Sequence, residues 1–373
     1  MRNLRIVLSF ILLPASIIYG FFVTIRNKLY DYGVFPSYSF KIPVIAVGNI
    51  TVGGTGKTPH TEFLANLLKE EFNVAILSRG YKRKTRGFRI AGIDSSVAGV
   101  GDEPLQMKLK YPGITVAVDS NRVSGIKKLL SGEKAPDVVL LDDAFQHRRV
   151  NPNLNILLID YSHPINKDFL LPLGNLREPK SGKKRANIIV VTKSPSDFKP
   201  IQRRVMLKKL KPYPYQKVFF TTLEYGEPMP VFPEKEKNSK TGQFSEELLK
   251  QEPSVLLVTA IANPTPLKKY LEENISEKIY SVKFADHHRF STQDISRIQR
   301  KFEKMEGEKK VIITTEKDAV RLRDYPILKD SFNEILFYIP VKIKFLNNRT
   351  DDFNKEIIEY VRKNKKHSFL YPQ

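Results

Sequence analysis

Cysteine is absent from the 373-residue sequence. Its absence excludes disulfide bonds, thiolate metal sites and cysteine nucleophiles. The chain also lacks an internal repeat, a long low-complexity tract, and a basic module interleaved with the aromatic side chains that stack on nucleic-acid bases. With 41% apolar and 10% aromatic residues it has the composition of a folded protein, and its length suffices for two α/β domains. A nucleic-acid-binding function is therefore not expected.

Positive charge is the strongest compositional bias. The 62 Lys and Arg residues against 40 Asp and Glu residues give a formal net charge of +22. A field of this sign attracts nucleic acid, phosphorylated substrates or anionic lipid headgroups. The basic residues are spread along most of the chain, whereas a nucleic-acid module concentrates them on one element. The charge therefore favours an anionic partner but does not choose its class.

Charged residues are also absent from positions 6–25, and Arg2, Arg5, Arg26 and Lys28 flank this apolar run. At about 1.5 Å per residue, a helix of this length matches a hydrocarbon core of about 30 Å. A cleaved secretory signal is one alternative, but no convincing small-x-small site follows the run. A nucleotide-binding loop further along the chain, described below, would also require a cytosolic address. A buried core helix is the other alternative.

The same run has a weakly polar stripe. Ser9, Ser16, Gly20 and Thr24 would fall on one helical face. A helix with such a stripe can lie in the membrane interface instead of spanning the bilayer. We expect residues 1–30 to form a membrane-associated helix, and the sequence leaves open whether it spans or lies flat.

Short hydrophobic segments alternate with helical patterns along the rest of the chain. Near-continuous Val, Ile and Leu segments of this kind predict parallel strands covered by helices on both faces. The first series comprises residues 42–49, 73–80, 114–119, 137–143, 155–160 and 187–193. The second series comprises residues 255–263, 278–284, 310–317 and 334–345.

A stretch rich in Pro, Glu, Lys and Ser at 226–253 separates the two series. The sequence thus predicts an α/β fold in which residues 31–225 form a P-loop domain with a doubly wound parallel sheet. Residues 226–373 are expected to form a second, smaller α/β domain that closes the active-site cleft.

The stretch VGNITVGGTGKTPH lies between a predicted strand and a predicted helix, where phosphate-binding loops occur. In such a loop, backbone N–H groups and glycines surround the phosphates, a lysine reaches the β and γ phosphates, and a hydroxyl holds Mg²⁺. We predict that the nucleotide-binding residues are Gly53, Gly54, Thr55, Gly56, Lys57 and Thr58. The usual pattern has glycine where this chain has Thr51, so a chance match is the alternative. Gly48 is expected to do part of the missing glycine's work.

A nucleotide site of this kind needs an acidic residue at the end of a neighbouring strand to hold Mg²⁺. Asp142 and Asp143 directly follow four apolar strand residues, and we expect them to hold the metal together with Thr58. The alternative is an aspartate pair that caps the following turn. Gln146 and His147 lie one turn further on, close enough to assist the metal or the phosphate.

Eight segments occur in one order along the chain: GNITVGGTGKTP, SRGYKRKTRG, GDEP, LDDAFQHRR, LPLGNLREP, VTKS, FADHHRF and TTEKDAVRL. In this combination the sequence resembles the tetraacyldisaccharide 4′-kinases, the lipid A kinases of Gram-negative bacteria. The resemblance runs from the apolar N-terminus to about residue 322. The phosphate loop of that family likewise lacks the first glycine, so Thr51 is compatible with nucleotide binding.

The resemblance implies phosphorylation of the 4′-hydroxyl of a tetraacylated glucosamine disaccharide 1-phosphate to give lipid IVA, with ATP and Mg²⁺ as cofactors. It places the protein on the cytoplasmic face of the bacterial inner membrane, and we expect a monomer. An acylated substrate lies in the bilayer, so a membrane-associated helix suits this reaction. A basic protein gains encounter rate with an anionic substrate and leaflet.

By the same resemblance, Asp102 of GDEP and His287 of FADHHRF form the pair that accepts the hydroxyl proton, and Lys57 completes the catalytic set. A carboxylate can orient an imidazole and adjust its basicity. A loop carboxylate is the alternative for Asp102, and a metal cluster or an ordinary turn is the alternative for the histidines. We choose His287 over His288 because it directly follows Asp286.

The family pattern further suggests residues that bind the sugar and its 1-phosphate. They are Arg79, Tyr81, Arg122, Asn175, Arg177 and Glu178. Arginine suits phosphate because its planar donors can bind two oxygens at once. The neighbouring Lys82, Arg83 and Lys84 are expected to form a solvated basic surface, and the TTEKD segment is given no role.

Two other functions compete with the lipid kinase. One is a P-loop kinase of another, soluble small molecule, which would have no use for the apolar N-terminus. The other is a membrane-associated P-loop NTPase switch that hydrolyses nucleotide to drive a partner. A switch would leave Asp102 and His287 without a task.

Overall fold

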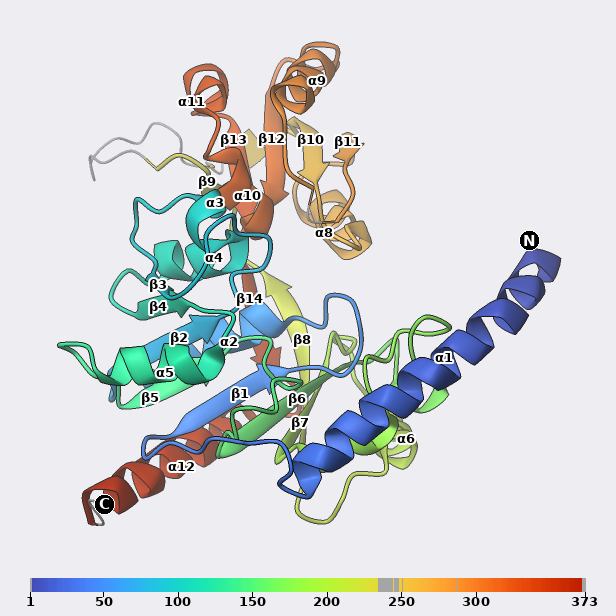
Figure 1. The fold of residues 1–373 in the computed structure, drawn as a ribbon. Coiled ribbons are helices and arrows are strands. Elements are labelled where there is room, and N and C mark those ends of the chain that lie inside the picture. The colour runs from blue at the N-terminus through green and yellow to red at the C-terminus, as the bar shows by residue number, and fades with distance from the viewer. Residues whose placement is uncertain (1, 234–243, 245–247, 250, 287, 371–373) are drawn as a thin grey trace.

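The computed structural model describes residues 2–233, 244, 248–249, 251–286 and 288–370. Over these residues the chain forms two β-sheets with helices packed against them (Figure 1). The expected α/β fold with a large, mainly parallel sheet is confirmed.

The larger sheet contains nine strands of the described chain, in the order β14-β8-β7-β6-β1-β5-β2-β4-β3. The strands are β1 (Val44–Gly48), β2 (Val74–Ser78), β3 (Arg89–Ile90), β4 (Thr115–Val118), β5 (Val138–Leu141), β6 (Leu154–Asp160), β7 (Ile188–Thr192), β8 (Lys217–Tyr225) and β14 (Val341–Phe345). The edge strands β3 and β14 are antiparallel to their neighbours. Since β1 lies between β5 and β6 in parallel register, the segments that follow β1 and β5 meet at one edge.

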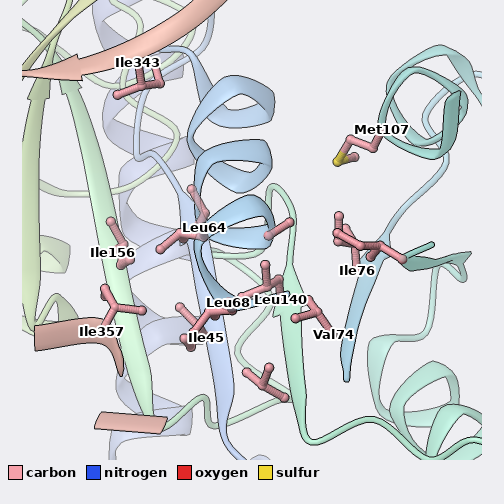
Figure 2. Close-up of a cluster of buried hydrophobic side chains, with 14 of the residues drawn as sticks. Ile45, Leu64, Leu68, Val74, Ile76, Met107, Leu140, Ile156, Ile343 and Ile357 are labelled. Carbon is pink, nitrogen blue, oxygen red and sulfur yellow. The ribbon is translucent and has the colours of Figure 1, made fainter. Parts of the chain in front are cut away.

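Helices cover both faces of this sheet. They are α1 (Arg2–Asp31), α2 (Lys57–Leu68), α3 (Val97–Val100), α4 (Asp102–Lys110), α5 (Arg122–Leu130), α6 (Pro200–Leu210) and α12 (Thr350–Leu370), with 3-10 turns η1 (Ile165–Lys167) and η2 (Lys180–Arg185). Side chains alternate along β1. Ile45 packs with Leu64 and Leu68 of α2 (Figure 2), whereas Val44 packs with Ile126 of α5. Burial on both faces explains why these strands read as continuous apolar runs.

The smaller sheet has the order β11-β10-β12-β13-β9. Its strands are β9 (Met229–Pro230), β10 (Ser254–Thr259), β11 (Ile279–Lys283), β12 (Lys310–Thr315) and β13 (Leu336–Ile339), and its helices are α8 (Thr265–Asn274), α9 (Thr292–Glu303), α10 (Glu316–Leu322) and α11 (Pro326–Phe332). Apolar clusters lie on both faces of this sheet as well, so each sheet of the described chain has its own core, and Val320 of α10 joins the core of the larger one.

The single strand predicted at 334–345 is two strands in different sheets. Pro340 separates β13 from β14, and a proline offers no N–H to a strand ladder. β14 pairs with β8, and Phe353 and Ile357 of α12 join the core of the larger sheet. The chain therefore crosses between the sheets twice. The domain division at residue 226 stays a prediction. The segment from β14 onward follows that boundary in the sequence but packs with the larger sheet.

Helix α1 packs part of its polar stripe against the protein. The Ser16 hydroxyl donates to the Leu170 carbonyl over 2.8 Å, and a Cβ added at Gly20 would lie 2.6 Å from the Leu170 side chain. The helix also exposes six large apolar side chains, Leu13, Ile17, Ile18, Phe21, Phe22 and Ile25, and near its end the basic Arg26 and Lys28. Among the described residues, no helix is both long and apolar enough to traverse a membrane.

Gly48 ends β1 against the chain that follows β5. A Cβ at Gly48 would lie 2.7 Å from the backbone nitrogen of Phe145. Gly48→Ala should therefore lower the free energy of unfolding by about 1–3 kcal/mol, because that chain must move. Urea unfolding monitored by circular dichroism tests this, with Gly113→Ala as control because nothing lies within 4 Å of a Cβ at Gly113. Equal stability of the two variants would contradict the close packing.

Candidate functional site

The phosphate-binding loop joins β1 to α2. Gly53 and Gly56 have φ angles of 101° and 83°, in the left-handed region that favours glycine. Gly56 immediately precedes α2, whose first two residues are Lys57 and Thr58. The unpaired N–H groups at a helix start attract phosphate. Residues 53–58 therefore have the backbone form that a nucleotide site needs.

Thr51 lies in a short antiparallel ribbon and not in a turn. It forms a bridge with Leu176, and the Val52 amide donates to the Asn175 carbonyl over 2.7 Å. An extended residue needs no positive φ, so this position does not require glycine. The expectation that Gly48 does part of the missing glycine's work is wrong, because Gly48 ends β1 and serves the close packing described above.

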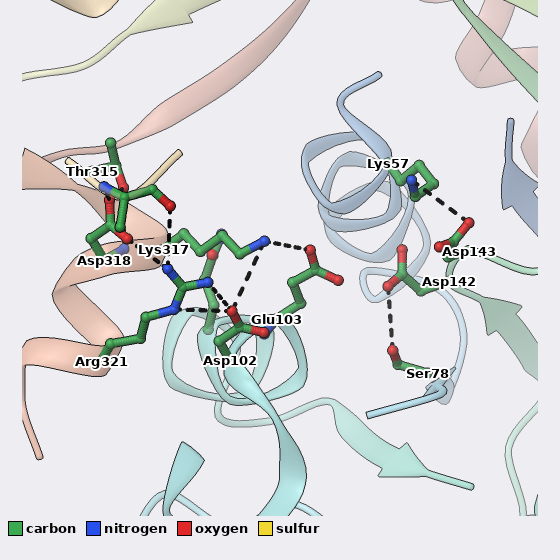
Figure 3. A network of polar contacts seen from close by, with 12 residues as sticks. Lys57, Ser78, Asp102, Glu103, Asp142, Asp143, Thr315, Lys317, Asp318 and Arg321 are labelled. Atoms are coloured by element: carbon green, nitrogen blue, oxygen red, sulfur yellow. Dashed lines mark hydrogen bonds and ion pairs between the residues drawn. The ribbon is translucent and has the colours of Figure 1, made fainter. Parts of the chain in front are cut away.

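Asp142 and Asp143 follow β5 and lie beside the loop lysine, as Figure 3 shows. Asp142 is 1% exposed and accepts hydrogen bonds from the hydroxyls of Thr61 (3.1 Å) and Ser78 (3.4 Å). Burial raises the pKa of Asp142 to about 7, and the negative charges of Glu103 and Asp143 act in the same direction. A nearby cation would therefore stabilise the ionised form of Asp142.

Asp143 faces two cationic side chains. Its carboxylate oxygens lie 3.7 Å from Lys57 Nζ and 3.8 Å from Arg177 Nη1. Within the described chain, no group of three or more His, Cys, Asp or Glu side chains is placed to hold a metal ion. Mg²⁺ in nucleotide sites takes one or two carboxylates and completes its shell with water and phosphate oxygens. Asp142, Asp143 and the Thr58 hydroxyl fit such a metal, carried in by a nucleotide.

Asp102 begins α4 and is held by residues of the smaller sheet (Figure 3). Arg321 donates to Asp102 Oδ2 from Nη2 and from Nε, the latter over 3.1 Å, and Lys317 Nζ lies 3.9 Å from the same oxygen. Arg321 also donates to Asp318 over 2.8 Å. Adjacent cations favour the ionised form of a carboxylate. Asp102 is therefore suited to orient and polarise a base more than to accept a proton itself.

The predicted partner of Asp102, His287, lies outside the described residues, so its role stays a prediction. The neighbouring His288 is described. Its Nε2 lies 2.9 Å from Asp294 Oδ2, and its ring stacks on Phe284 with centroids 4.9 Å apart. His288 is thus engaged with side chains of its own region.

Lys317 and Arg321 are site residues that sequence reasoning missed. Both lie on α10, within and just after the TTEKD segment, and Lys317 Nζ also lies 2.8 Å from Glu103 Oε1. The available signal was the position of this segment directly after β12, because the carboxyl ends of parallel strands carry functional side chains. The contact itself joins residues more than 200 positions apart, which no local pattern reveals.

The residues expected to bind the sugar and its phosphate lie in different settings. Arg79 and Tyr81 are exposed after β2. Arg122 is only 2% exposed, and its guanidinium donates to the carbonyls of Asp119 (3.0 Å) and Asp142 (3.4 Å). Burial lowers the pKa of Arg122 to about 10. In this structure Arg122 supports the backbone that carries Asp142, and its contact with substrate stays a prediction.

Asn175, Arg177 and Glu178 lie near α1. Glu178 is buried, forms an ion pair with Arg185 over 2.7 Å and accepts from Asn27 over 3.1 Å. A pocket of about 360 Å³ at this place is lined by Tyr19, Val23, Arg26, Gln146, Leu171, Arg177 and Glu178. It combines the apolar side chains of Val23 and Leu171 with the guanidinium groups of Arg26 and Arg177.

A lysine bridges two carboxylates between the sheets. Lys110 Nζ lies 2.7 Å from Glu62 of α2 and 2.9 Å from Glu316 of α10. Burial, and then the charge of Glu316, raise the pKa of Glu62 to about 7 against the opposing effect of Lys110. Burial lowers the pKa of Lys110, but the two carboxylates raise it by more. Near neutral pH Lys110 is therefore charged, and Glu62 is protonated in about half of the molecules.

The sequence matches one protein family over nearly its whole length. The family model described as tetraacyldisaccharide-1-P 4′-kinase matches residues 8–362. The chain belongs to this family. A tetraacyldisaccharide 4′-kinase of Bacteroides thetaiotaomicron is 49% identical over 96% of this chain and 94% of that protein. One from Flavobacterium johnsoniae is 44% identical over 95% and 97%.

A solved structure supports the same family. The crystal structure of LpxK from Aquifex aeolicus in complex with ATP is 30% identical, with a TM-score of 0.72 over 96% of this chain and 99% of that chain. The resemblance predicted from the eight segments is thus confirmed for the family as a whole. The roles of single residues within this tetraacyldisaccharide 4′-kinase remain proposals that rest on the geometry above.

Glu62 should make stability depend on pH. An exposed glutamate loses its proton near about pH 4.3, whereas Glu62 keeps it to about pH 7. Its contribution is therefore full at low pH and is lost as pH rises through about 7. Glu62→Gln should therefore remove the part of the pH dependence that Glu62 contributes, a fall of about 1–3 kcal/mol in the free energy of unfolding between about pH 5 and pH 8.

Urea unfolding across this pH range measures the effect. Glu70→Gln is the control, because Glu70 is exposed just beyond α2. Asp142 titrates in the same sense in both proteins, so the difference between them isolates Glu62. An unchanged pH dependence in Glu62→Gln would contradict the protonated cluster.

Proposed function

We propose that this chain transfers the γ-phosphate of ATP to the 4′-hydroxyl of a tetraacylated glucosamine disaccharide 1-phosphate, giving the lipid A precursor lipid IVA. The observation that carries the proposal is the pairing of a phosphate-binding loop with a carboxylate, Asp102, that the smaller sheet holds nearby. The two parts are close, since Glu103 acts on the pKa of Asp142. A site that only hydrolyses nucleotide has no need of this second, acceptor-side carboxylate.

The nucleotide binds at the loop. Backbone N–H groups of Gly53, Gly54, Thr55 and Gly56 surround the phosphates, and Lys57 reaches the β and γ phosphates. In this structure the anionic partner of Lys57 is Asp143, at 3.7 Å. When a nucleotide binds, its phosphate takes the place of Asp143 as the partner of Lys57.

Thr58, Asp142 and Asp143 would hold the metal. When bound, Mg²⁺ neutralises charge on the transferring phosphate. A cation bound there would favour the ionised form of Asp142, whose pKa burial raises to about 7.

The pair of Asp102 and His287 activates the acceptor hydroxyl. The 4′-oxygen attacks the γ-phosphorus, its proton passes to the imidazole that we assign to His287, and the bond from the γ-phosphorus to the ADP oxygen breaks. Arg321 and Lys317 hold the Asp102 carboxylate in place, so Asp102 orients the imidazole and stabilises the imidazolium that forms. In this mechanism Asp102 is the orienting group and His287 is the base.

The acylated acceptor lies along α1. Arg26 and Arg177 line the pocket there and provide guanidinium groups for the 1-phosphate, while the exposed Phe21 and Phe22 enter the bilayer interface. Further substrate contacts come from Arg79, Tyr81, Arg122, Asn175 and Glu178. The protein therefore works at the cytoplasmic face of the inner membrane, where ATP is present. We further propose that it acts as a monomer, because all these groups come from one chain.

Transfer of labelled γ-phosphate from ATP to detergent-dispersed tetraacyldisaccharide 1-phosphate tests the function. Wild type should give labelled lipid. Lys57→Met should abolish the product because the γ-phosphate loses its cation, and Asp102→Asn should lower kcat by about 10²–10⁴-fold with ATP affinity unchanged. Asp197→Asn, at an exposed position, is the control.

Two results would contradict the proposal. Release of free phosphate without labelled lipid would show an NTPase and not a lipid kinase. Near-normal turnover of Asp102→Asn would remove the proposed role of Asp102.

A further inference from the structure

The outward face of α6 is unusual because it mixes aliphatic and basic side chains. Ile201 and Val205, one helical turn apart, are 61% and 44% exposed. Arg204 and Lys208 lie on the same stripe and are exposed. A surface helix of a globular protein normally turns its aliphatic side chains to the core. In α6, Met206 and Leu210 pack in the core, whereas Ile201 and Val205 are exposed and lie outside it.

A basic groove lies next to this stripe. It has a volume of about 570 Å³ and runs between the end of α6, η1 and the start of η2. Five lysines line it: Lys180, Lys183, Lys208, Lys209 and Lys211. Its apolar lining comes from Ile165, Val205 and Leu210. A volume of this size accommodates a lipid headgroup or another small anion.

Within the part of the chain that the structure describes, Lys180 and Lys183 donate hydrogen bonds to backbone carbonyls, whereas the other three lysines form no ion pair. Lys183 Nζ donates to the carbonyls of Leu210 and Lys211 at the end of α6, and Lys180 Nζ donates to the Asn166 carbonyl over 2.9 Å. Lys208, Lys209 and Lys211 form no ion pair with any carboxylate of the described chain. By contrast, nearby Lys184 and Lys193 pair with Asp31 and Asp160. The groove therefore carries uncompensated positive charge.

The groove is connected through η1 to the segment that packs on α1. α6 packs on η1, and the chain leaving η1 reaches the exposed Phe169 and then Leu170, whose carbonyl accepts from Ser16 of α1. On the far side, Tyr213 and Tyr215 are exposed and stack on each other with centroids 5.6 Å apart. Apolar, aromatic and cationic side chains thus extend from α1 to the end of α6.

We propose that this groove binds the phosphate headgroups of anionic phospholipids, and that the α6 stripe is a second contact with the bilayer besides α1. The inference rests on the proposed membrane contact of α1. Exposed aliphatic side chains between cations match the region where headgroups meet acyl chains. Lysines near an anionic leaflet each strengthen binding, whereas a purely polar polyanion would leave Ile201 and Val205 in water. A contact on each side of Phe169 would fix the orientation of the enzyme on the membrane.

Vesicle cosedimentation of the full-length protein tests the inference. Vesicles of phosphatidylcholine alone are compared with vesicles containing phosphatidylglycerol, using wild type, Lys208→Glu/Lys209→Glu, and Lys304→Glu/Lys309→Glu. The last pair changes net charge equally at exposed positions of the smaller-sheet region. The groove variant should lose about tenfold or more in partitioning to anionic vesicles, while the control matches wild type. Kinase activity in detergent should stay unchanged for both variants.

The outcomes separate the two proposals. If wild type binds neither vesicle, the membrane contact of α1 fails and the groove inference fails with it, whereas kinase activity in detergent still reports on the proposed function. If wild type binds but the groove variant partitions like the control, the groove inference is overturned and α1 is unaffected. An equal loss on neutral and anionic vesicles would also overturn it, because headgroup charge would not be involved. A loss of single-stranded RNA binding without a loss of vesicle binding would assign the groove to a different polyanion.

Discussion

The buried ion pair of Asp102 with Arg321, supported by the half-buried Lys317, joins the two sheets at the point where chemistry is proposed. Asp102 belongs to α4 of the larger sheet, and both cations belong to α10 of the smaller one. Asp318 anchors Arg321 in turn and accepts from the Ala260 amide over 2.9 Å. Removing one partner of such a buried pair costs about 3–5 kcal/mol, because the other charge stays uncompensated. The placement of Asp102 near the phosphate loop therefore depends on the smaller sheet.

Helix α2 extends this dependence to the nucleotide. It begins with Lys57 at the phosphate loop and carries Glu62, which Lys110 connects to Glu316 of α10. The smaller sheet thus contacts the acceptor side through Arg321. It is also linked, through Lys110, to the helix that follows the phosphate loop. A shift of α10 would move both sides of the reaction, which suits a kinase that must bring two substrates together.

Local patterns predicted the parts of this enzyme that lie close together in sequence. The parallel strands, residues 53–58 and the aspartates at the end of β5 follow from hydrophobic runs and glycine spacing. The return of β14 to the larger sheet was missed, because one apolar run covers two strands and only Pro340 marks the break. The buried setting of Arg122 and the reach of Arg321 to Asp102 depend on packing between distant segments. Periodicity carries no information about such contacts.

The most direct test of the central claim is a double-mutant cycle on the single-turnover rate of phosphoryl transfer, with ATP affinity measured alongside. Arg321→Met should lower the rate without changing ATP affinity. If Arg321 acts by holding Asp102, the double variant Asp102→Asn/Arg321→Met should lose no more than Asp102→Asn alone. Multiplied losses in the double variant, or a loss explained by weaker ATP binding, would show that the smaller sheet does not act through Asp102.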